Sequence, residues 1–144
     1  MSGDDVMARA REIARHAHAG QVDKAGRDYY RTHVADVVHR VGNDATLQAV
    51  AYLHDVVEDT SWTLDDLTHV GFPDEVVAAV DAITHRPHEN RLAYYARVKA
   101  NSIALAVKLA DLASNTDPQR LAMLSPSTRT RLIAKYERAK VELR

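Results

Sequence analysis

Two histidines and two aspartates in this chain could together hold one catalytic divalent metal ion. They are His33, the adjacent pair His54 and Asp55, and Asp111. Two neutral imidazoles and two carboxylates leave coordination positions open on an octahedral ion, and those positions can hold water or substrate. The set therefore predicts a catalytic metal site rather than a closed structural one, with Mn²⁺, Fe²⁺, Mg²⁺ or Zn²⁺ as candidate ions.

A second pair of acids, Glu58 and Asp59, follows His54 and Asp55 at a spacing of four residues. Residues four apart share one face of a helix and are separated by one turn of about 5.4 Å. A metal lowers the pKa of a bound water from about 15.7 towards about 7, and a nearby carboxylate can take its remaining proton or protonate a leaving oxygen. Glu58 and Asp59 are therefore the predicted catalytic residues of a hydrolase; the alternative is a solvated helix end.

The same helical spacing places Lys108 and Asn115 on one side of a helix with Asp111. Lys108 could neutralise the charge of a substrate, and Asn115 could bind a ribose or phosphate oxygen. Both are candidates for substrate binding. The alternatives are an ion pair for Lys108 and a helix C-terminal cap for Asn115.

The segments that carry these residues are the most apolar of the chain, which predicts two central helices. Residues 45–57 are apolar on nearly every side, and residues 103–112 are interrupted only by Lys108 and Asp111. Burying ionisable side chains in such surroundings costs several kcal/mol each unless something compensates them. A bound cation would do so; alternatively, His54 and Asp55 form a hydrogen-bonded core pair and Asp111 is a satisfied buried acid.

Further helices are predicted from apolar spacing, caps and breakers. His33 lies at the start of the second of them, after a loop over residues 21–30. No segment alternates with the period of a strand. The predicted fold is all-α, a single-domain bundle of about seven to eight helices over residues 1–144. The remaining helices are expected at about residues 5–19, 34–41, 73–84, 91–100 and 128–144, with a further short helix that begins at the capping box of residues 63–66.

The composition of the chain limits which partners it is expected to bind and where in the cell it is expected to be. The chain of 144 residues has no cysteine, which excludes disulfides and thiolate metal sites. Its formal net charge of -1, with acids and bases interleaved, gives no broad basic field for duplex nucleic acid or a membrane surface. No apolar stretch approaches the ~18 residues of a membrane span, and the N-terminal residues lack an apolar signal segment, so a cytoplasmic location is expected. The oligomeric state stays open.

Four sequence segments carry a resemblance to a known family. The chain resembles the HD-domain metal phosphohydrolases, and among them the hydrolase domain of the RelA/SpoT family and the small alarmone hydrolases. That resemblance implies an HD-type helical bundle, Mn²⁺ held by His33, His54, Asp55 and Asp111, and Glu58 and Asp59 assisting the attacking water. It implies removal of the 3′-pyrophosphate of guanosine tetra- or pentaphosphate, and it adds the matching Lys24 as a substrate-binding candidate. The segments are AHAGQ at 17–21, LHDVVEDT at 53–60, VDAIT at 80–84 and VKLADLASN at 107–115.

Three positions depart from the family pattern around the first histidine. Asp23 stands where the family has arginine, and Asp28 and Val34 stand where it has proline. An acid at position 23 should repel a polyphosphate by an amount on the order of 1 kcal/mol, although Arg27 could compensate. Two alternatives to an alarmone hydrolase stay open. One is an HD-type nucleotidase or pyrophosphatase that acts on another nucleotide, such as a nucleoside monophosphate, a deoxynucleotide or a phosphorylated dinucleotide. The other is a non-catalytic nucleotide-binding module.

Overall fold

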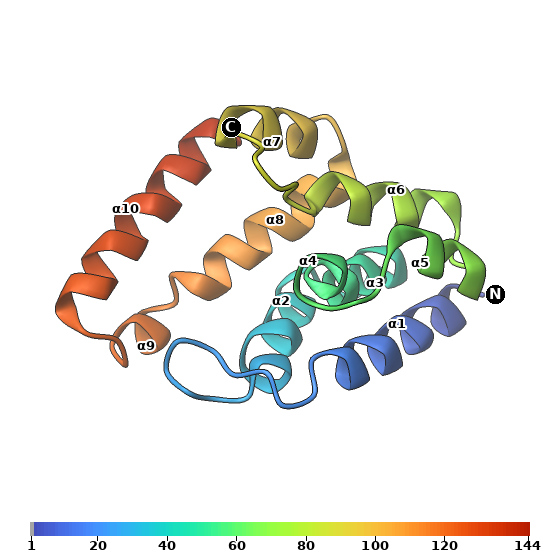
Figure 1. Cartoon of the computed structure of the whole chain (residues 1–144), viewed down its shortest axis with the longest axis horizontal. Helices are drawn as coiled ribbons and strands as arrows, with labels where there is room; N and C mark the ends of the chain where they lie inside the picture. Colours follow the sequence, from blue (N-terminus) through green and yellow to red (C-terminus); the bar gives the residue numbers. More distant parts are fainter. Residues whose placement is uncertain (1) are drawn as a thin grey trace.

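The computed structural model describes residues 2–144, and within them every regular element is helical. Eight α-helices have six or more residues, and α4 and α9 are single turns of four (Figure 1). The all-α prediction and its count of longer helices are confirmed. The bounds are α1 Gly3–Ala17, η1 Tyr30–Val34, α2 Ala35–Arg40, α3 Ala45–Leu53, α4 Val56–Asp59, α5 Leu64–Val70, α6 Asp74–Ile83, α7 Arg91–Lys99, α8 Ser102–Asn115, α9 Pro118–Leu121 and α10 Pro126–Glu142.

Side-chain caps fix where several of these helices begin. The Asp44 carboxylate accepts a hydrogen bond from the backbone N–H of Leu47, at 2.9 Å, at the start of α3. Thr63 and Asp66 form the reciprocal capping box that their spacing predicts for α5. Each cap satisfies backbone N–H groups that have no partner inside the helix, which is typically worth about 1 kcal/mol.

Helix α8 is the centre of the bundle, as its apolar sequence predicts. It packs against α2, α3, α6, α7 and α10 (Figure 1). Helix α3, the other predicted central helix, packs against α1, α2, α6 and α8, and four of its side chains are buried. These two helices bring the segments that contain His54, Asp55 and Asp111 together in the core.

The predicted continuous helix over residues 45–57 is interrupted at the functional residues. Helix α3 ends at Leu53, His54 and Asp55 form a turn, and α4 begins at Val56. Consecutive residues of a regular helix point about 100° apart, so an unbroken helix would separate the two side chains. Asp55 has φ -110° and ψ -1°, in the sparsely populated region where many active-site residues lie. The break allows both side chains to face the same point.

The chain between α1 and the next helix is a loop, as predicted, and it is closed by a single antiparallel bridge between Val22 and Asp28. It leads into the π-helical turn η1, which contains His33 and continues directly into α2. π-Helical turns within helices occur frequently at functional sites. No helix of residues 2–144 has the length and apolar character needed to cross a membrane.

Candidate metal centre

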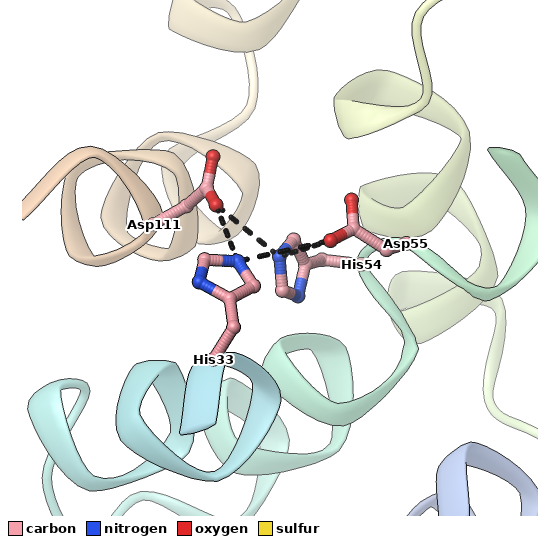
Figure 2. A group of neighbouring side chains, drawn as sticks. All are labelled: His33, His54, Asp55 and Asp111. Carbon is pink, nitrogen blue, oxygen red and sulfur yellow. Dashed lines mark ion pairs between the residues drawn. The ribbon is translucent and has the colours of Figure 1, made fainter. Parts of the chain in front are cut away.

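Four side chains from three separate segments of the sequence converge in one cluster, as Figure 2 shows. His33 comes from η1, His54 and Asp55 from the turn after α3, and Asp111 from α8. One ligand atom from each lies within 4.8 Å of all the others. The predicted quartet is therefore a single cluster that could hold one metal ion.

The distances within the cluster join imidazole nitrogens to carboxylate oxygens. His33 Nε2 lies 2.9 Å from Asp111 Oδ1 and 3.8 Å from Asp55 Oδ2. His54 Nε2 lies 3.0 Å from Asp55 Oδ2 and 3.5 Å from Asp111 Oδ1. Both histidines and Asp111 are buried, with exposed fractions of 1%, 2% and 6%. A buried set of this kind needs positive charge to balance two carboxylates.

The hydrogen bonds of His54 prepare one of its nitrogens to act as a metal ligand. Its Nδ1 lies 2.6 Å from the carbonyl oxygen of Ala51. A carbonyl can only accept, so Nδ1 carries the hydrogen and the neutral ring has its lone pair on Nε2. That Nε2 is buried and has no hydrogen-bond partner although a carboxylate oxygen is close. Two facing lone pairs are unfavourable without a cation between them, so the residues fit a metal ion.

The electrostatics of the cluster point to the same conclusion. Burial alone would lower the pKa of His54, but the neighbouring Asp55 and Asp111 carboxylates outweigh it and raise that pKa well above its ordinary value. Burial would raise the pKa of Asp55, yet the His54 imidazole holds it at about 2. Both shifts mean that this point in the protein stabilises positive charge, which a divalent cation supplies.

Neighbouring groups hold the carboxylates and imidazoles in place. The Tyr29 hydroxyl donates a hydrogen bond to Asp55 Oδ2. Ser114 Oγ lies 3.2 Å from His33 Nδ1. Ser114 was not identified from the sequence, although it lies three residues after Asp111 on α8 and therefore on the same face. Partners of this kind fix the orientation of metal ligands and raise their affinity.

Lys108 and Asn115 both bind the Asp111 carboxylate. Lys108 Nζ lies 3.1 Å from Oδ2, and Asn115 Nδ2 donates to Oδ1 at 3.2 Å. The ion pair expected as the alternative for Lys108 is thus present. Asn115 is the last residue of α8 and Thr116 is its C-cap, so the alternative of a capping role for Asn115 is wrong.

Glu58 and Asp59 lie beside the cluster and are held by contacts from other segments. Glu58 Oε1 accepts a hydrogen bond from the backbone N–H of His85 at 2.9 Å, and Asp59 Oδ2 accepts one from Gln21 Nε2 at 3.1 Å. Partial burial raises the pKa of both carboxyl groups, and the nearby Asp55 charge raises it further. A carboxyl group with a raised pKa next to a metal site is suited to accepting and returning a proton.

Asp23, the acid that departs from the family pattern, is turned away from solvent. Its side chain is 4% exposed, and its Oδ1 accepts hydrogen bonds from the backbone N–H groups of Ala25 and Arg27, each at 2.9 Å. Its Oδ2 lies 3.6 Å from Arg27 Nε and 3.6 Å from Arg120 Nη2. These contacts outweigh burial and lower the pKa of Asp23. The expected repulsion of a polyphosphate is therefore compensated by two arginines, one of which was foreseen.

Lys24 and Asn115 border one cavity of about 200 Å³. Lys24 is exposed, and Tyr29 and Tyr136 contribute aromatic surface to the same cavity. Arg120 also borders it and was not identified from the sequence. Its Nη1 lies 3.3 Å from both the Thr32 carbonyl oxygen and His33 Nδ1. Because Arg120 also pairs with Asp23, it links the loop to the turn that carries the first histidine.

Replacing Asp23 by alanine is expected to destabilise the fold by about 1–3 kcal/mol, because two backbone N–H groups and two arginines lose a buried partner. Urea denaturation followed by circular dichroism measures this change. Replacement of the exposed neighbour Lys24 by alanine is the matched control and should leave the free energy of unfolding nearly unchanged. Equal midpoints for both variants would contradict a structural role for the Asp23 carboxylate.

Comparisons with known proteins indicate the family of the chain. The model of the HD domain family matches residues 10–142. A probable GTP pyrophosphokinase of Mycobacterium leprae is 43% identical over 82 residues, which are 55% of this chain and 10% of that protein. A probable guanosine-3′,5′-bis(diphosphate) 3′-pyrophosphohydrolase of Synechocystis is 29% identical over 141 residues, 88% of this chain and 18% of that protein. The chain thus spans a fifth or less of these relatives.

A solved structure shares the fold. It is that of a metazoan orthologue of SpoT that hydrolyses ppGpp, with a TM-score of 0.80 and 22% sequence identity over 96% of this chain and 85% of that one. The helical bundle and the match of the family model over nearly the whole chain lead to one conclusion: this chain belongs to the HD domain family.

Proposed function

We propose that this protein is a metal-dependent phosphohydrolase that acts on a nucleotide. The preferred reaction is removal of the 3′-pyrophosphate of guanosine tetra- or pentaphosphate alarmones. The observation that carries the proposal is the buried His54 Nε2, without a hydrogen-bond partner, in a cluster of two histidines and two aspartates. The names of the Synechocystis relative and the metazoan structure support the choice of substrate.

The proposed ligands of one divalent ion are His33, His54, Asp55 and Asp111. Mn²⁺ is the preferred ion, with Mg²⁺, Fe²⁺ and Zn²⁺ as alternatives, because a set of imidazoles and carboxylates accepts all four. When bound, such an ion supplies a water of lowered pKa and neutralises charge on a phosphate oxygen.

The proposed roles of the surrounding residues follow from their positions. Glu58 and Asp59 receive the proton of the attacking water and return it to the leaving oxygen, since their raised pKa values suit proton exchange. Lys24, Lys108 and Asn115 are proposed to bind the substrate. Lys108 and Asn115 also position Asp111, with which both form polar contacts.

The extent of the domain and the setting of the protein are also proposals. We propose that residues 1–144 form one HD-type domain that binds a small nucleotide and neither duplex nucleic acid nor a membrane. The near-neutral formal charge of -1 supports the absence of a broad nucleic-acid surface. A cytoplasmic location stays a prediction.

A substrate panel with Mn²⁺, Mg²⁺ and Zn²⁺, read by phosphate and pyrophosphate release, tests the function. We expect the highest rate of pyrophosphate release from guanosine tetraphosphate with Mn²⁺. Nucleoside monophosphates, deoxynucleotides and dinucleotides carrying a 2′- or 3′-phosphate serve as comparison substrates. A rate on the alarmone no higher than on unrelated nucleotides would overturn the substrate assignment.

The second candidate is an HD-type nucleotidase or pyrophosphatase on another nucleotide. The departures from the family pattern at Asp23, Asp28 and Val34 favour it, because they lie in the loop and the turn that precede and contain the first proposed ligand. A third reading is a non-catalytic nucleotide-binding module. It predicts that chelation lowers the melting temperature while none of the panel yields a product.

A further inference from the structure

A second cavity borders the metal centre, and three of the side chains around it are cationic. It has a volume of about 310 Å³. Helix α7 contributes Arg91, α8 contributes Lys108 and α10 contributes Lys135. Its other walls include Glu58, His85 and Tyr94. Three different helices therefore bring basic side chains to one cavity.

Two of the lining residues connect this cavity directly to the proposed reaction centre. Lys108 Nζ lies 3.1 Å from Asp111 Oδ2 and 5.3 Å from the centroid of the Tyr94 ring. Glu58, one of the proposed catalytic acids, lines the cavity and is tied to its rim by the backbone N–H of His85. A group bound in the cavity would thus lie next to both a metal ligand and a catalytic acid.

The cations of this cavity exceed the anions that could neutralise them. Asp111 balances Lys108, which leaves Arg91 and Lys135 facing the single carboxylate of Glu58. Among residues 2–144, neither Arg91 nor Lys135 forms an ion pair within 4.0 Å. Burial lowers the pKa of Lys135, and repulsion from Arg91 and Lys108 lowers it further. An anion in the cavity would relieve that repulsion.

The cavity on the other side of Asp111 has a different character. It is the one bordered by Asn115 and Tyr29. Leu132 and Tyr136 give it apolar and aromatic walls, and its charged lining residues are Asp23, Lys24, Arg27 and Arg120. Flat, partly apolar walls suit a nucleoside, whereas clustered ammonium and guanidinium groups suit phosphate oxygens. Both arginines of that cavity pair with the Asp23 carboxylate, whereas neither Arg91 nor Lys135 has an ion-pair partner among residues 2–144, so the cavity of Lys135 is the better site for an anion.

We propose that the cavity formed by Arg91, Lys108 and Lys135 binds a diphosphate group of the nucleotide substrate. The inference rests on the proposed function and assigns Arg91 and Lys135 a role in substrate binding. The diphosphate has two possible sources: the 3′-pyrophosphate that hydrolysis releases, or the 5′-diphosphate that stays on the nucleoside. Both present the same oxygens to the three cations.

Binding of inorganic pyrophosphate and of GDP, measured by isothermal titration calorimetry, tests the cavity without requiring turnover. For the probe that the wild type binds, pyrophosphate or GDP, we expect Lys135→Gln to weaken binding about tenfold. The double variant with Lys135→Gln and Arg91→Gln should bind that probe more weakly still, because further charge-assisted hydrogen bonds are lost. Arg138→Gln is the matched control, since it removes one exposed charge from the same helix outside the cavity. Melting temperatures check that all variants are folded.

The two probes separate the two sources. Weaker binding of pyrophosphate, with GDP binding unchanged, assigns the cavity to the leaving group, and the reverse assigns it to the 5′-diphosphate. Unchanged binding of both probes in the double variant would overturn the proposal, as would a wild-type protein that binds neither. If the substrate panel yields no product while Lys135→Gln still weakens binding, the proposed hydrolysis fails and the anion site stands.

Discussion

Replacing Asp55 by alanine is expected to abolish both stoichiometric binding of a divalent metal and turnover. Asp55 Oδ2 lies 3.0 Å from His54 Nε2, and its loss leaves a buried imidazole facing the cluster with one fewer counter-charge. Loss of an outer partner of a metal ligand typically lowers affinity or activity about 10- to 100-fold, and loss of a ligand should exceed that. Metal content measured by elemental mass spectrometry and pyrophosphate release give the two readouts.

Two further variants separate loss of the metal site from loss of the fold. Asp55→Asn keeps the size of the side chain and a hydrogen-bond partner for the Tyr29 hydroxyl, so it should fold while binding metal poorly. Asp65→Ala removes an exposed acid from α5 and should change neither readout. Hydrolysis retained by a folded Asp55→Ala protein would contradict the proposed mechanism, whichever nucleotide is the substrate.

The four proposed metal ligands could be predicted from the sequence because three of them are ionisable residues within or at the end of apolar segments. Asp111 interrupts an apolar helix, and His54 and Asp55 end another, so the burial of these three side chains needs a physical reason. The same apolar patterns predicted which helices are central. Periodicity and capping residues are local signals: α6 and α8 follow them closely, and α3 and α5 begin where their caps predict.

Features that depend on distant parts of the chain could not be predicted in this way. The break between α3 and α4 arises because His54 and Asp55 must both face His33 and Asp111, and no glycine or proline marks it. Asp23 was expected to repel a phosphate, yet its charge is balanced by Arg120, a residue of α9 nearly a hundred positions later. Local spacing carries no information on such a pair.

Replacing Glu58 by glutamine is expected to lower kcat by about 10²- to 10⁴-fold while metal binding is retained, because a glutamine amide cannot accept the proton of the attacking water. The substitution keeps an oxygen that can accept the hydrogen bond from the His85 backbone N–H. Kinetics at saturating substrate, together with metal content, measure the two properties. Glu75→Gln, an exposed acid at the start of α6, is the control and should keep full activity.

Because the pKa of Glu58 is raised, Glu58→Gln should also affect stability, and at neutral pH it should not lower it. A carboxyl group whose folded-state pKa lies above its unfolded value binds its proton more tightly in the folded protein, so its contribution to stability is present at low pH and lost as pH rises through the folded pKa. Above that pKa the wild type holds a partly buried negative charge near Asp55, which glutamine removes. Glu58→Gln should therefore melt no lower than the wild type at pH 7, with any gain in melting temperature disappearing at acidic pH. An acid that lowers stability at neutral pH is expected to be retained because it has a function. If Glu58→Gln is folded and keeps full kcat, Glu58 takes no part in the reaction. Asp59 is then the remaining candidate for the proton acceptor.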